Sequence, residues 1–369
     1  MAPTRVPLTQ RFVDFKTGLD VNYTGPAPAD MAAAFRKFLD VVEPFEQYLL
    51  PGYWNFPNPG QIPADLLLPF SQFVKKHGIE AAVPLAFQIT AFGAGDFDTA
   101  LTLYVLSAFN QPLIRFALGN ATLFVPSSRR NLEVYEAIQL RLGDRVLYNT
   151  TVVQSDRKPH SHTLRVRNNV SGACTVIQAK KLLLSIEPTT ANMQPFNLDG
   201  RESGVFNKFS YQNVHVGLVS HPSLPVGVSL VNTPPAAANG NYWEVVKPNF
   251  NIRFDHMGFN SANWRVMVVA NTTLSVSEAQ GLVRTNLATF ISAGTVSPGD
   301  ANTMQVKAWS NHGSMHAHFS ANEVRTGLIQ RLYGLQGHKG TWWTGGAWSQ
   351  QFQSILWAYD DVLLSKMFP

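Results

Sequence analysis

Cysteine, charged residues and long apolar runs are all scarce in this chain of 369 residues. The one cysteine, Cys174, excludes a disulfide bond within the chain. No apolar run approaches the roughly 20 residues that a membrane-spanning helix needs, and the stretch from Met1 to Phe12 lacks the apolar core of a signal peptide. We therefore expect no membrane span and a cytoplasmic location, with secretion possible if an N-terminal signal has been lost.

Charged residues amount to 14% of the chain, against about 25% in an average soluble domain. The net charge is +5, but Lys and Arg occur singly or in pairs such as Lys75-Lys76 and Lys180-Lys181. Without a basic stripe, a chain has little from which to build contacts to successive phosphates. We therefore expect no nucleic-acid partner. The excess positive charge would suit an anionic cofactor but does not identify one.

Apolar residues make up 45% of the sequence, with 8 Trp and 24 Phe, enough for two domains with cores. Apolar periodicity and cap residues predict five helices. They cover residues 30–43, 64–77, 129–142 and 275–291 and a last segment that begins at Ser349. Gly78 and Gly143 would end the second and third helices, and Ser275-x-x-Glu278 has the pattern of a capping box. Residues 81–125 are so apolar that periodicity does not decide between helix and buried strand.

Short segments rich in β-branched residues, with turn residues between them, predict strands. They are residues 146–154, 163–167, 175–178, 182–186, 214–219, 227–231, 243–246, 252–254, 265–270 and 340–344. The chain has no internal repeat. The mixture of strands and helices predicts an α/β or α+β fold with a mixed sheet.

The sharpest local pattern is TWWTGGAWS, from Thr341 to Ser349. A predicted strand runs into two glycines and then into a predicted helix. Glycines allow a bulky ligand to approach the backbone closely, and a helix start offers N–H donors and partial positive charge to an anion such as pyrophosphate. The same pattern also fits a strand–turn–helix unit that only closes a core.

The longer stretch LYGLQGHKGTWWTGGAW, from Leu332 to Trp348, is similar to the C-terminal FAD motif of the flavin-containing amine oxidoreductase superfamily, in the branch of the β-cyclopiazonate dehydrogenase-like enzymes. Two further stretches resemble strands of that superfamily in the same order, LGDRVLYNTTVVQSDR from Leu142 to Arg157 and AKKLLLSIEPTTANM from Ala179 to Met193. The resemblance covers most of residues 10–369. It is specific around 142–193 and 332–357 and diffuse elsewhere.

The resemblance implies FAD as the cofactor and assigns roles to eight residues. Val152 would pair its backbone with the adenine, and Trp342 or Trp343 would face the flavin ring. Gly345, Gly346 and Ala347 would border the cofactor, with Gln353 and Ser354 near the flavin end of the last helix. No catalytic residue is assigned, because in this superfamily the flavin itself removes the electrons while the protein orients and shields the substrate.

The chain departs from the superfamily in one respect: it has no Gly-x-Gly-x-x-Gly unit followed by an acidic residue. Gly93-Ala94-Gly95 lies near an apolar run, but Asp98 occupies the place of the third glycine. We therefore expect an incomplete FAD-binding Rossmann-like domain beside a mixed-sheet, helix-covered substrate domain. The remaining sheet would then have an exposed edge and an open apolar face.

Four segments follow from this division of the chain. We expect substrate-domain helices and loops in residues 1–135, an FAD-domain segment in 136–199, a substrate-domain sheet with one helix in 200–324, and a C-terminal FAD-domain segment in 325–369. The implied activity is oxidation of a C–N or C–C bond in a small, largely apolar substrate. The alternative is a truncated, flavin-free remnant or non-catalytic binding protein of the same fold. The substrate, electron acceptor and oligomeric state stay open.

Three histidines, His312, His316 and His318, invite a metal interpretation, because an extended chain would bring them to one face. A firm zinc site needs further ligands, and no cysteine or paired carboxylate lies beside them in the sequence. We expect no metal here and a polar strand that lines the substrate cavity.

Overall fold

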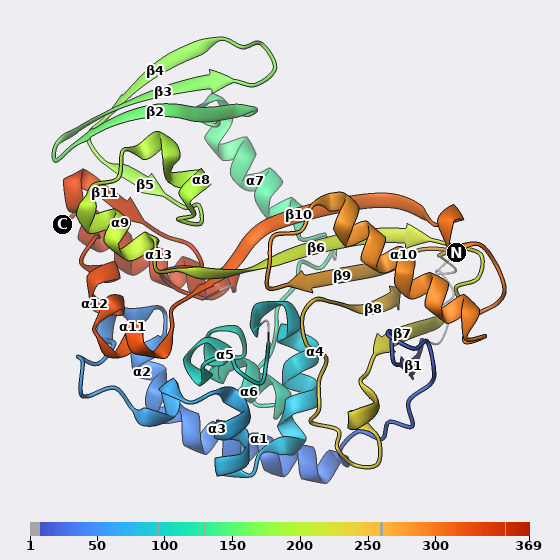
Figure 1. Ribbon diagram of the computed structural model, residues 1–369. Coiled ribbons are helices and arrows are strands. Elements are labelled where there is room, and N and C mark those ends of the chain that lie inside the picture. The colour runs from blue at the N-terminus through green and yellow to red at the C-terminus, as the bar shows by residue number, and fades with distance from the viewer. Residues whose placement is uncertain (1–7, 95, 129, 259–260, 351) are drawn as a thin grey trace. The chain divides into compact units, whose positions relative to one another are not determined.

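The computed structural model describes residues 8–94, 96–128, 130–258, 261–350 and 352–369 (Figure 1). The chain forms two compact units, each assembled from three separate stretches of sequence. The first unit comprises the residues up to Gln47, Gln61–Ile114 and Ser210–Ala321. The second comprises Tyr48–Gly60, Arg115–Phe209 and Asn322–Pro369. These boundaries group 48–60 and 115–135 with the second unit, whereas the sequence-based division put them with the substrate domain.

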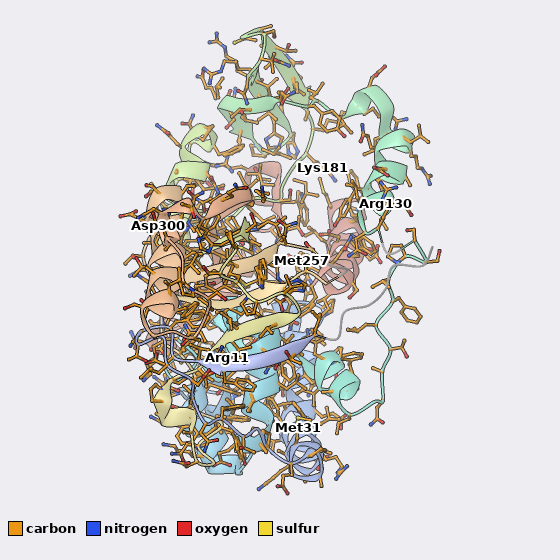
Figure 2. The ribbon with its side chains drawn as sticks, turned by 90° about the vertical axis from the view of Figure 1, so that its right-hand side faces the viewer. Arg11, Met31, Arg130, Lys181, Met257 and Asp300 are labelled. Carbon is orange, nitrogen blue, oxygen red and sulfur yellow. The ribbon has the colours of Figure 1, made fainter. Side chains whose placement is uncertain are left out.

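The first unit is built on a six-stranded mixed sheet in the order β1-β7-β8-β9-β6-β10. Its strands are β1 (Thr9–Val13), β6 (Ser210–Ser220), β7 (Val228–Asn232), β8 (Phe250–His256), β9 (Trp264–Ala270) and β10 (Gln305–His318). Strand β1 runs parallel to β7 and the other pairs are antiparallel. The edge strand β1 is held by Arg11 (Figure 2), whose Nε donates to Asp20 Oδ1 at 2.6 Å and whose Nη1 donates to the Thr295 carbonyl.

Helix α10 (Val276–Ser292) covers one face of this sheet, and α4 (Val83–Ala94) contacts it from the other side (Figure 1). The α10 side chains Val283, Leu287 and Phe290 are fully buried against Phe254 and Val266. The remaining helices of the unit are α1 (Pro28–Val42), α2 (Glu46–Leu49), α3 (Phe70–His77), α5 (Thr102–Ala108), α6 (Gln111–Ala117) and α11 (Ala321–Arg325), some of which end in the second unit. Short 3-10 turns lie at Glu43–Phe45, Ala64–Leu67, Glu80–Ala82, Pro235–Ala237 and Ala301–Thr303.

The second unit has two small sheets. Strands β2 (Thr150–Lys158), β3 (Ser161–Asn168) and β4 (Cys174–Ala179) form an antiparallel sheet, and β5 (Leu182–Leu184) pairs in parallel with β11 (Thr341–Trp343). Its helices are α7 (Leu132–Leu142), α8 (Thr190–Met193), α9 (Gly200–Phe206), α12 (Leu328–Tyr333) and α13 (Gln353–Met367), with 3-10 turns at Tyr53–Asn55, Gly143–Arg145, Gln194–Phe196 and His338–Gly340. The Lys181 ammonium (Figure 2) ties β5 to the end of α13 by donating to the Met367 carbonyl.

Local signals predicted several element ends correctly. Gly78 and Gly143 follow α3 and α7 with φ values of +56° and +54°, a conformation that favours glycine. At the start of α10, Ser275 Oγ accepts from the Glu278 N–H at 3.2 Å and Glu278 Oε2 accepts from the Ser275 N–H at 2.7 Å. Both bonds of the predicted capping box therefore form.

One predicted strand was wrong, and three predicted helices begin later than expected. Residues 243–246 are irregular chain instead of a strand, although three of the four are apolar. The helix expected from Ala64 is a 3-10 turn, and α3 begins only after Pro69, because a proline fits the start of a helix and breaks its interior. The last helix begins at Gln353 instead of Ser349, whose Oγ donates to the Pro51 carbonyl. Helix α7 begins at Leu132, beyond the expected Arg129, which lies outside the described residues.

Residues 81–125, which periodicity left open, are mainly helical. They contain α4, α5 and α6, and then irregular chain from 118 to 125. The unpatterned apolar sequence has a physical reason, because α5 exposes none of its residues, and Leu103, Val105 and Leu106 on different sides of it are fully buried. A helix buried on every side has no polar stripe to reveal its period.

Candidate functional site

The diglycine turn, Gly345 to Ser349, follows directly from strand β11. The Thr344 N–H donates to the Leu184 carbonyl of β5 at 2.9 Å, and the Trp348 and Ser349 N–H groups both donate to the Gly345 carbonyl at 3.1 Å. Gly345 has φ +109°, and a Cβ placed there would meet only the Ser185 carbonyl group, at 3.8 Å and beyond. Its backbone conformation therefore requires glycine, while the space beside it is open.

The two neighbouring tryptophans point to opposite faces of β11, as strand geometry requires. Trp343 is fully buried and stacks on Trp348, with ring centroids 5.4 Å apart and planes 13° from parallel. Phe206 meets Trp343 edge-on at 5.0 Å. Trp342 is half-buried and lies over Gly337, where a Cβ would come within 3.2 Å of its ring. Of the two candidates for a ring that faces a ligand, only Trp342 keeps an accessible surface.

Tyr333 and Tyr53 hold the backbone at the far end of the turn. The Tyr53 N–H donates to the Tyr333 hydroxyl at 2.6 Å, and that hydroxyl donates to the Trp348 carbonyl. Burial raises the pKa of Tyr333 well above its ordinary value, and the nearby Tyr359 adds to the effect. The hydroxyl therefore stays protonated and remains a donor to the turn.

Gln336 and Asp360 hold the strand that enters the turn. Gln336 Oε1 accepts from the Trp343 N–H at 2.9 Å, while its Nε2 donates to the Trp343 carbonyl at 2.8 Å and to the Tyr359 hydroxyl at 2.9 Å. The Thr344 hydroxyl donates to Asp360 Oδ1 on α13. Burial raises the pKa of Asp360 despite that hydrogen bond. Both residues before Gly345 are thus anchored through side chains.

Three buried indole N–H donors belong to the same unit as this backbone. The Nε1 atoms of Trp54, Trp343 and Trp348 have no hydrogen-bond acceptor among the residues that the structure describes. Buried polar groups in proteins nearly always find a partner, so such donors ask for an explanation. The protein itself closes these donors off from solvent, so the accessible part of the turn region is the space beside Gly345 and the half-buried ring of Trp342.

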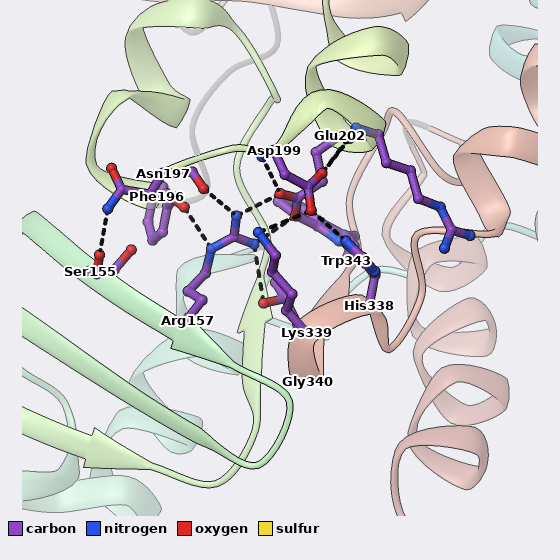
Figure 3. Close-up of polar contacts among 12 residues, drawn as sticks. Ser155, Arg157, Phe196, Asn197, Asp199, Glu202, His338, Lys339, Gly340 and Trp343 are labelled. Carbon is purple, nitrogen blue, oxygen red and sulfur yellow. Dashed lines mark hydrogen bonds and ion pairs between the residues drawn. The ribbon is translucent and has the colours of Figure 1, made fainter.

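A buried ion pair links strand β2 to the strand that leads into the turn (Figure 3). The Arg157 guanidinium binds both Glu202 carboxylate oxygens at 2.7 Å, and the two side chains are 1% and 0% exposed. The same guanidinium donates to Thr341 Oγ1 of β11 at 3.2 Å and to the Phe196 carbonyl at 2.6 Å. A fork of five donors can serve all these acceptors at once, which a lysine could not do.

Asp199 extends this network to the surface (Figure 3). Its Oδ1 caps α9 by accepting from the Arg201 and Glu202 N–H groups at 3.0 Å, and its Oδ2 meets His338 Nε2 at 2.7 Å and Lys339 Nζ at 3.0 Å. Burial alone would raise the pKa of Asp199. The hydrogen bonds from His338, the Glu202 N–H and Lys339 outweigh it and hold that pKa well below its usual range.

The ligand atoms of Asp199, Glu202 and His338 lie within 4.8 Å of one another, a spacing that could hold a metal ion. Here, however, Arg157 and Lys339 already neutralise the two carboxylates. A bound cation would have to displace them or be repelled by them. The arrangement is therefore an ion-pair network that fixes β2, α9 and β11 relative to one another.

The three histidines do not share one face of β10. Bulges interrupt the strand between Asn311 and Gly313 and between Met315 and His318, and bulges break the alternation of side chains. His312 is exposed, whereas His316 is buried with φ +55°, and burial lowers its pKa to about 4. The shared face expected from an extended strand is thus wrong.

The structure brings together some of the eight predicted cofactor residues and separates others. Gly345, Gly346 and Ala347 form the turn, with Trp342 and Trp343 just before it. Val152 lies on β2, the outer strand of the three-stranded sheet, opposite Val166. Gln353 and Ser354 are exposed in the first turn of α13, whose N-terminus has no side-chain cap.

The residues that anchor the turn were not predicted. Arg157, Glu202, Gln336, Tyr333 and Tyr359 come from four distant stretches of sequence, and no short motif joins them. One local signal was available, because Asp199-x-x-Glu202 has the capping-box pattern and both of its bonds form. It would have located the start of α9 but not the buried partner Arg157.

The fold and the turn define a class of protein: the chain has a flavin amine oxidoreductase-like fold. It matches the crystal structure of a conjugated-linoleic-acid-producing fatty acid isomerase from P. acnes with a TM-score of 0.73 and 18% identity, covering 100% of this chain and 82% of that one. It matches a putrescine oxidase with a TM-score of 0.55 and 13% identity, covering 98% of this chain and 82% of that one.

The sequence is related to particular fungal enzymes. It is 29% identical to β-cyclopiazonate dehydrogenase of Aspergillus flavus over 372 aligned positions, which cover 98% of this chain and 75% of that enzyme. It is 27% identical to the FAD-dependent oxidoreductase pigF of Monascus ruber, covering 93% of this chain and 70% of that enzyme. No protein-family model matches the sequence. Among the described residues, no helix is both long and apolar enough to cross a membrane.

Proposed function

We propose that this chain is an FAD-dependent oxidoreductase in which the diglycine turn lies against the flavin nucleotide. The observation that carries the proposal is the turn itself. Gly345 has a left-handed backbone conformation and open space beside it, and the stacked rings of Trp343 and Trp348 lie on either side of it in the sequence. Relatedness to β-cyclopiazonate dehydrogenase over 98% of the chain supports it, because that alignment includes the turn and strand β2.

Each predicted residue has a role in this proposal. Gly345, Gly346 and Ala347 would border the cofactor, and the backbone of Val152 would meet the adenine. Trp342 would face the flavin ring, because Trp343 is committed to the stack with Trp348. Gln353 and Ser354 would lie at the flavin end of α13, where helix N–H groups are free to bind anionic or acceptor atoms.

When bound, a flavin supplies a two-electron acceptor, which suits oxidation of a C–N or C–C bond in a small, largely apolar substrate. The chain's own residues would bind, orient and exclude water. Arg157 would act as a positioning residue, because it connects β2 and β11, the two strands assigned to opposite ends of the cofactor. The protonated hydroxyls of Tyr333 and Tyr359 would keep the turn in its open form.

A flavin-free binding protein of the same fold is the second candidate, and one observation favours it. No residue of α7 is buried, and Leu140, Leu132 and Tyr135 are 86%, 58% and 53% exposed. The described residues therefore leave an apolar helix uncovered in the unit assigned to FAD. A complete cofactor domain would be expected to cover it.

Flavin content separates the two candidates. The purified chain should carry the visible absorbance of flavin at near-stoichiometric loading if the first proposal is correct, and it should be colourless if the second is. Gly345→Val should lose most of the flavin, because a β-branched side chain fits neither the φ of +109° nor the space of the cofactor.

The matched control is Gly172→Val in the hairpin between β3 and β4, which has φ +73° and open space around it. It imposes a similar backbone strain in the same unit, away from the turn. Equal flavin content in the two variants, at equal thermal stability, would remove the cofactor assignment of the turn.

A further inference from the structure

A small cleft lies entirely within the first unit, between α4, strands β7 and β8, and the segment 233–246. Its volume is about 40 Å³, several times the roughly 10–15 Å³ that a single water requires. Its walls are mostly apolar and aromatic, and include Phe12, Tyr23, Phe87 and Tyr242. The first two rings are 4.5 Å apart, and Phe87 is fixed from behind by Phe97 at 5.7 Å. The cleft therefore has aromatic walls suited to a small apolar group.

One guanidinium stands in this apolar lining. Arg253 of β8 lines the cleft and donates from Nη2 to the carbonyl of Gln88, which lines it too. That carbonyl is its one hydrogen-bond acceptor recorded among the described residues, although a guanidinium has five N–H donors. Burial lowers the pKa of Arg253, but an arginine keeps its charge in proteins.

The nearest carboxylate on the same strand is already engaged. Asp255 binds Arg265 Nη2 at 2.5 Å and accepts from Ser229 Oγ at 3.0 Å. Its charge acts on Arg253 only at longer range, and the positive charge of Arg265 opposes it. Arg253 is thus a half-buried cation with donors to spare. A planar carboxylate is the partner that best matches its fork.

Glu244 is the acidic side chain in the lining, and its negative charge opposes the positive charge of Arg253. It lies within electrostatic reach of Lys247, whose ammonium is paired with Asp98 Oδ2 at 2.8 Å. If Glu244 dominated, the cleft would favour a cation. Arg253 dominates in our assignment, because it is hydrogen-bonded to the lining of the cleft through the Gln88 carbonyl and has further N–H donors.

We propose that this cleft binds a small organic acid, with its carboxylate on Arg253 and its apolar body against Phe12, Phe87 and Tyr242. The site is independent of the flavin proposal, because all its residues belong to the first unit. A phosphate ester fits it less well, since a single guanidinium among aromatic rings offers too few donors for a doubly charged group.

Calorimetric titration of the full chain with acetate, acetamide and ethylammonium tests this proposal. The three probes are small, as a cleft of about 40 Å³ requires, and they differ in charge. Acetate should bind at least about tenfold more tightly than either of the others, in line with a charge-assisted pair in a partly dry site. Arg253→Met should weaken acetate binding by a similar factor, while the matched surface change Arg36→Met on α1 should leave it unchanged.

Glu244→Gln provides a second readout that leaves Arg253 in place. Removing the negative charge should tighten acetate binding by a few-fold. Tighter ethylammonium binding than acetate binding, or weaker acetate binding by Glu244→Gln, would overturn the proposal in favour of a cation site. Unchanged acetate affinity in folded Arg253→Met would also overturn it, since the acid would then bind elsewhere.

Discussion

The interiors of the two units are held together by different chemistry. In the first unit, α10 packs Val283, Leu287 and Phe290 into an entirely apolar cluster on the sheet. In the second unit, the buried pair of Arg157 and Glu202 ties strands and helices together from the centre of a polar network. An apolar cluster is tolerant because its contacts are non-directional. A buried ion pair fixes one geometry and is costly to break, because either partner alone is a desolvated charge.

The largest expected effect comes from breaking the ion pair. Glu202→Gln should destabilise the second unit by about 3–5 kcal/mol, because it leaves the Arg157 guanidinium buried without a counter-charge. Chemical denaturation followed by tryptophan fluorescence would report it, since Trp343 and Trp348 belong to the same unit.

A surface pair on the same strand is the control for that change. Asp156 and Lys158 of β2 are 2.9 Å apart, with side chains 61% and 68% exposed. Asp156→Asn should cost less than about 1 kcal/mol, as exposed pairs usually do. If the two variants lost equal stability, burial of the Arg157 pair would not be what stabilises the unit.

The apolar cluster should respond next. Leu287→Ala on α10 removes a fully buried side chain and should cost about 2–5 kcal/mol. Leu140→Ala on α7 removes the same atoms from an 86% exposed position and should stay within about 0.5 kcal/mol. Urea denaturation of both variants measures the contrast. A large cost at Leu140 would mean that α7 is covered in solution, for example by another copy or another protein.

The smallest expected effect is a dependence on pH. The lowered pKa of Asp199 means that its interactions stabilise the fold fully above its unfolded pKa of about 4, and that this contribution fades as the pH falls further. At neutral pH, Asp199→Asn should cost at most about 1 kcal/mol, because its partners His338 and Lys339 are partly exposed. The difference from the parent chain should shrink at about pH 3. A constant difference would exclude Asp199 ionisation as its source.

Much of the fold could be predicted where the signal is local. The N-cap at Ser275 and the helix ends at Gly78 and Gly143 depend on backbone geometry within a few residues, so they can be predicted from the local sequence. Residues 243–246 have the composition of a strand but form irregular chain, and the last three of them line a cleft. All four are only partly buried, and composition alone cannot distinguish a partly buried strand from a partly buried loop.

The candidate site divides in the same way. The diglycine turn could be predicted because two glycines between a strand and a helix are a local pattern, and Gly345 does adopt a conformation that favours glycine. Its supports could not. Arg157 reaches Thr341 across 184 residues, and nothing at either position indicates the other.

The sequence by itself determined the helix ends that are capped locally, at Ser275, Gly78 and Gly143, and the turn at Gly345, whose conformation requires glycine. Both follow from steric rules within a single peptide segment. It also determined the relationship to flavin-dependent oxidoreductases, through motifs of contiguous residues. Only the tertiary structure decided that α10 is covered while α7 is not, that Trp343 is fully buried and Trp342 only half-buried, and that Arg157 meets Glu202. Those outcomes depend on which segments, distant in the sequence, pack against each other. Whether a side chain is buried is decided by these contacts and not by the sequence of its own segment.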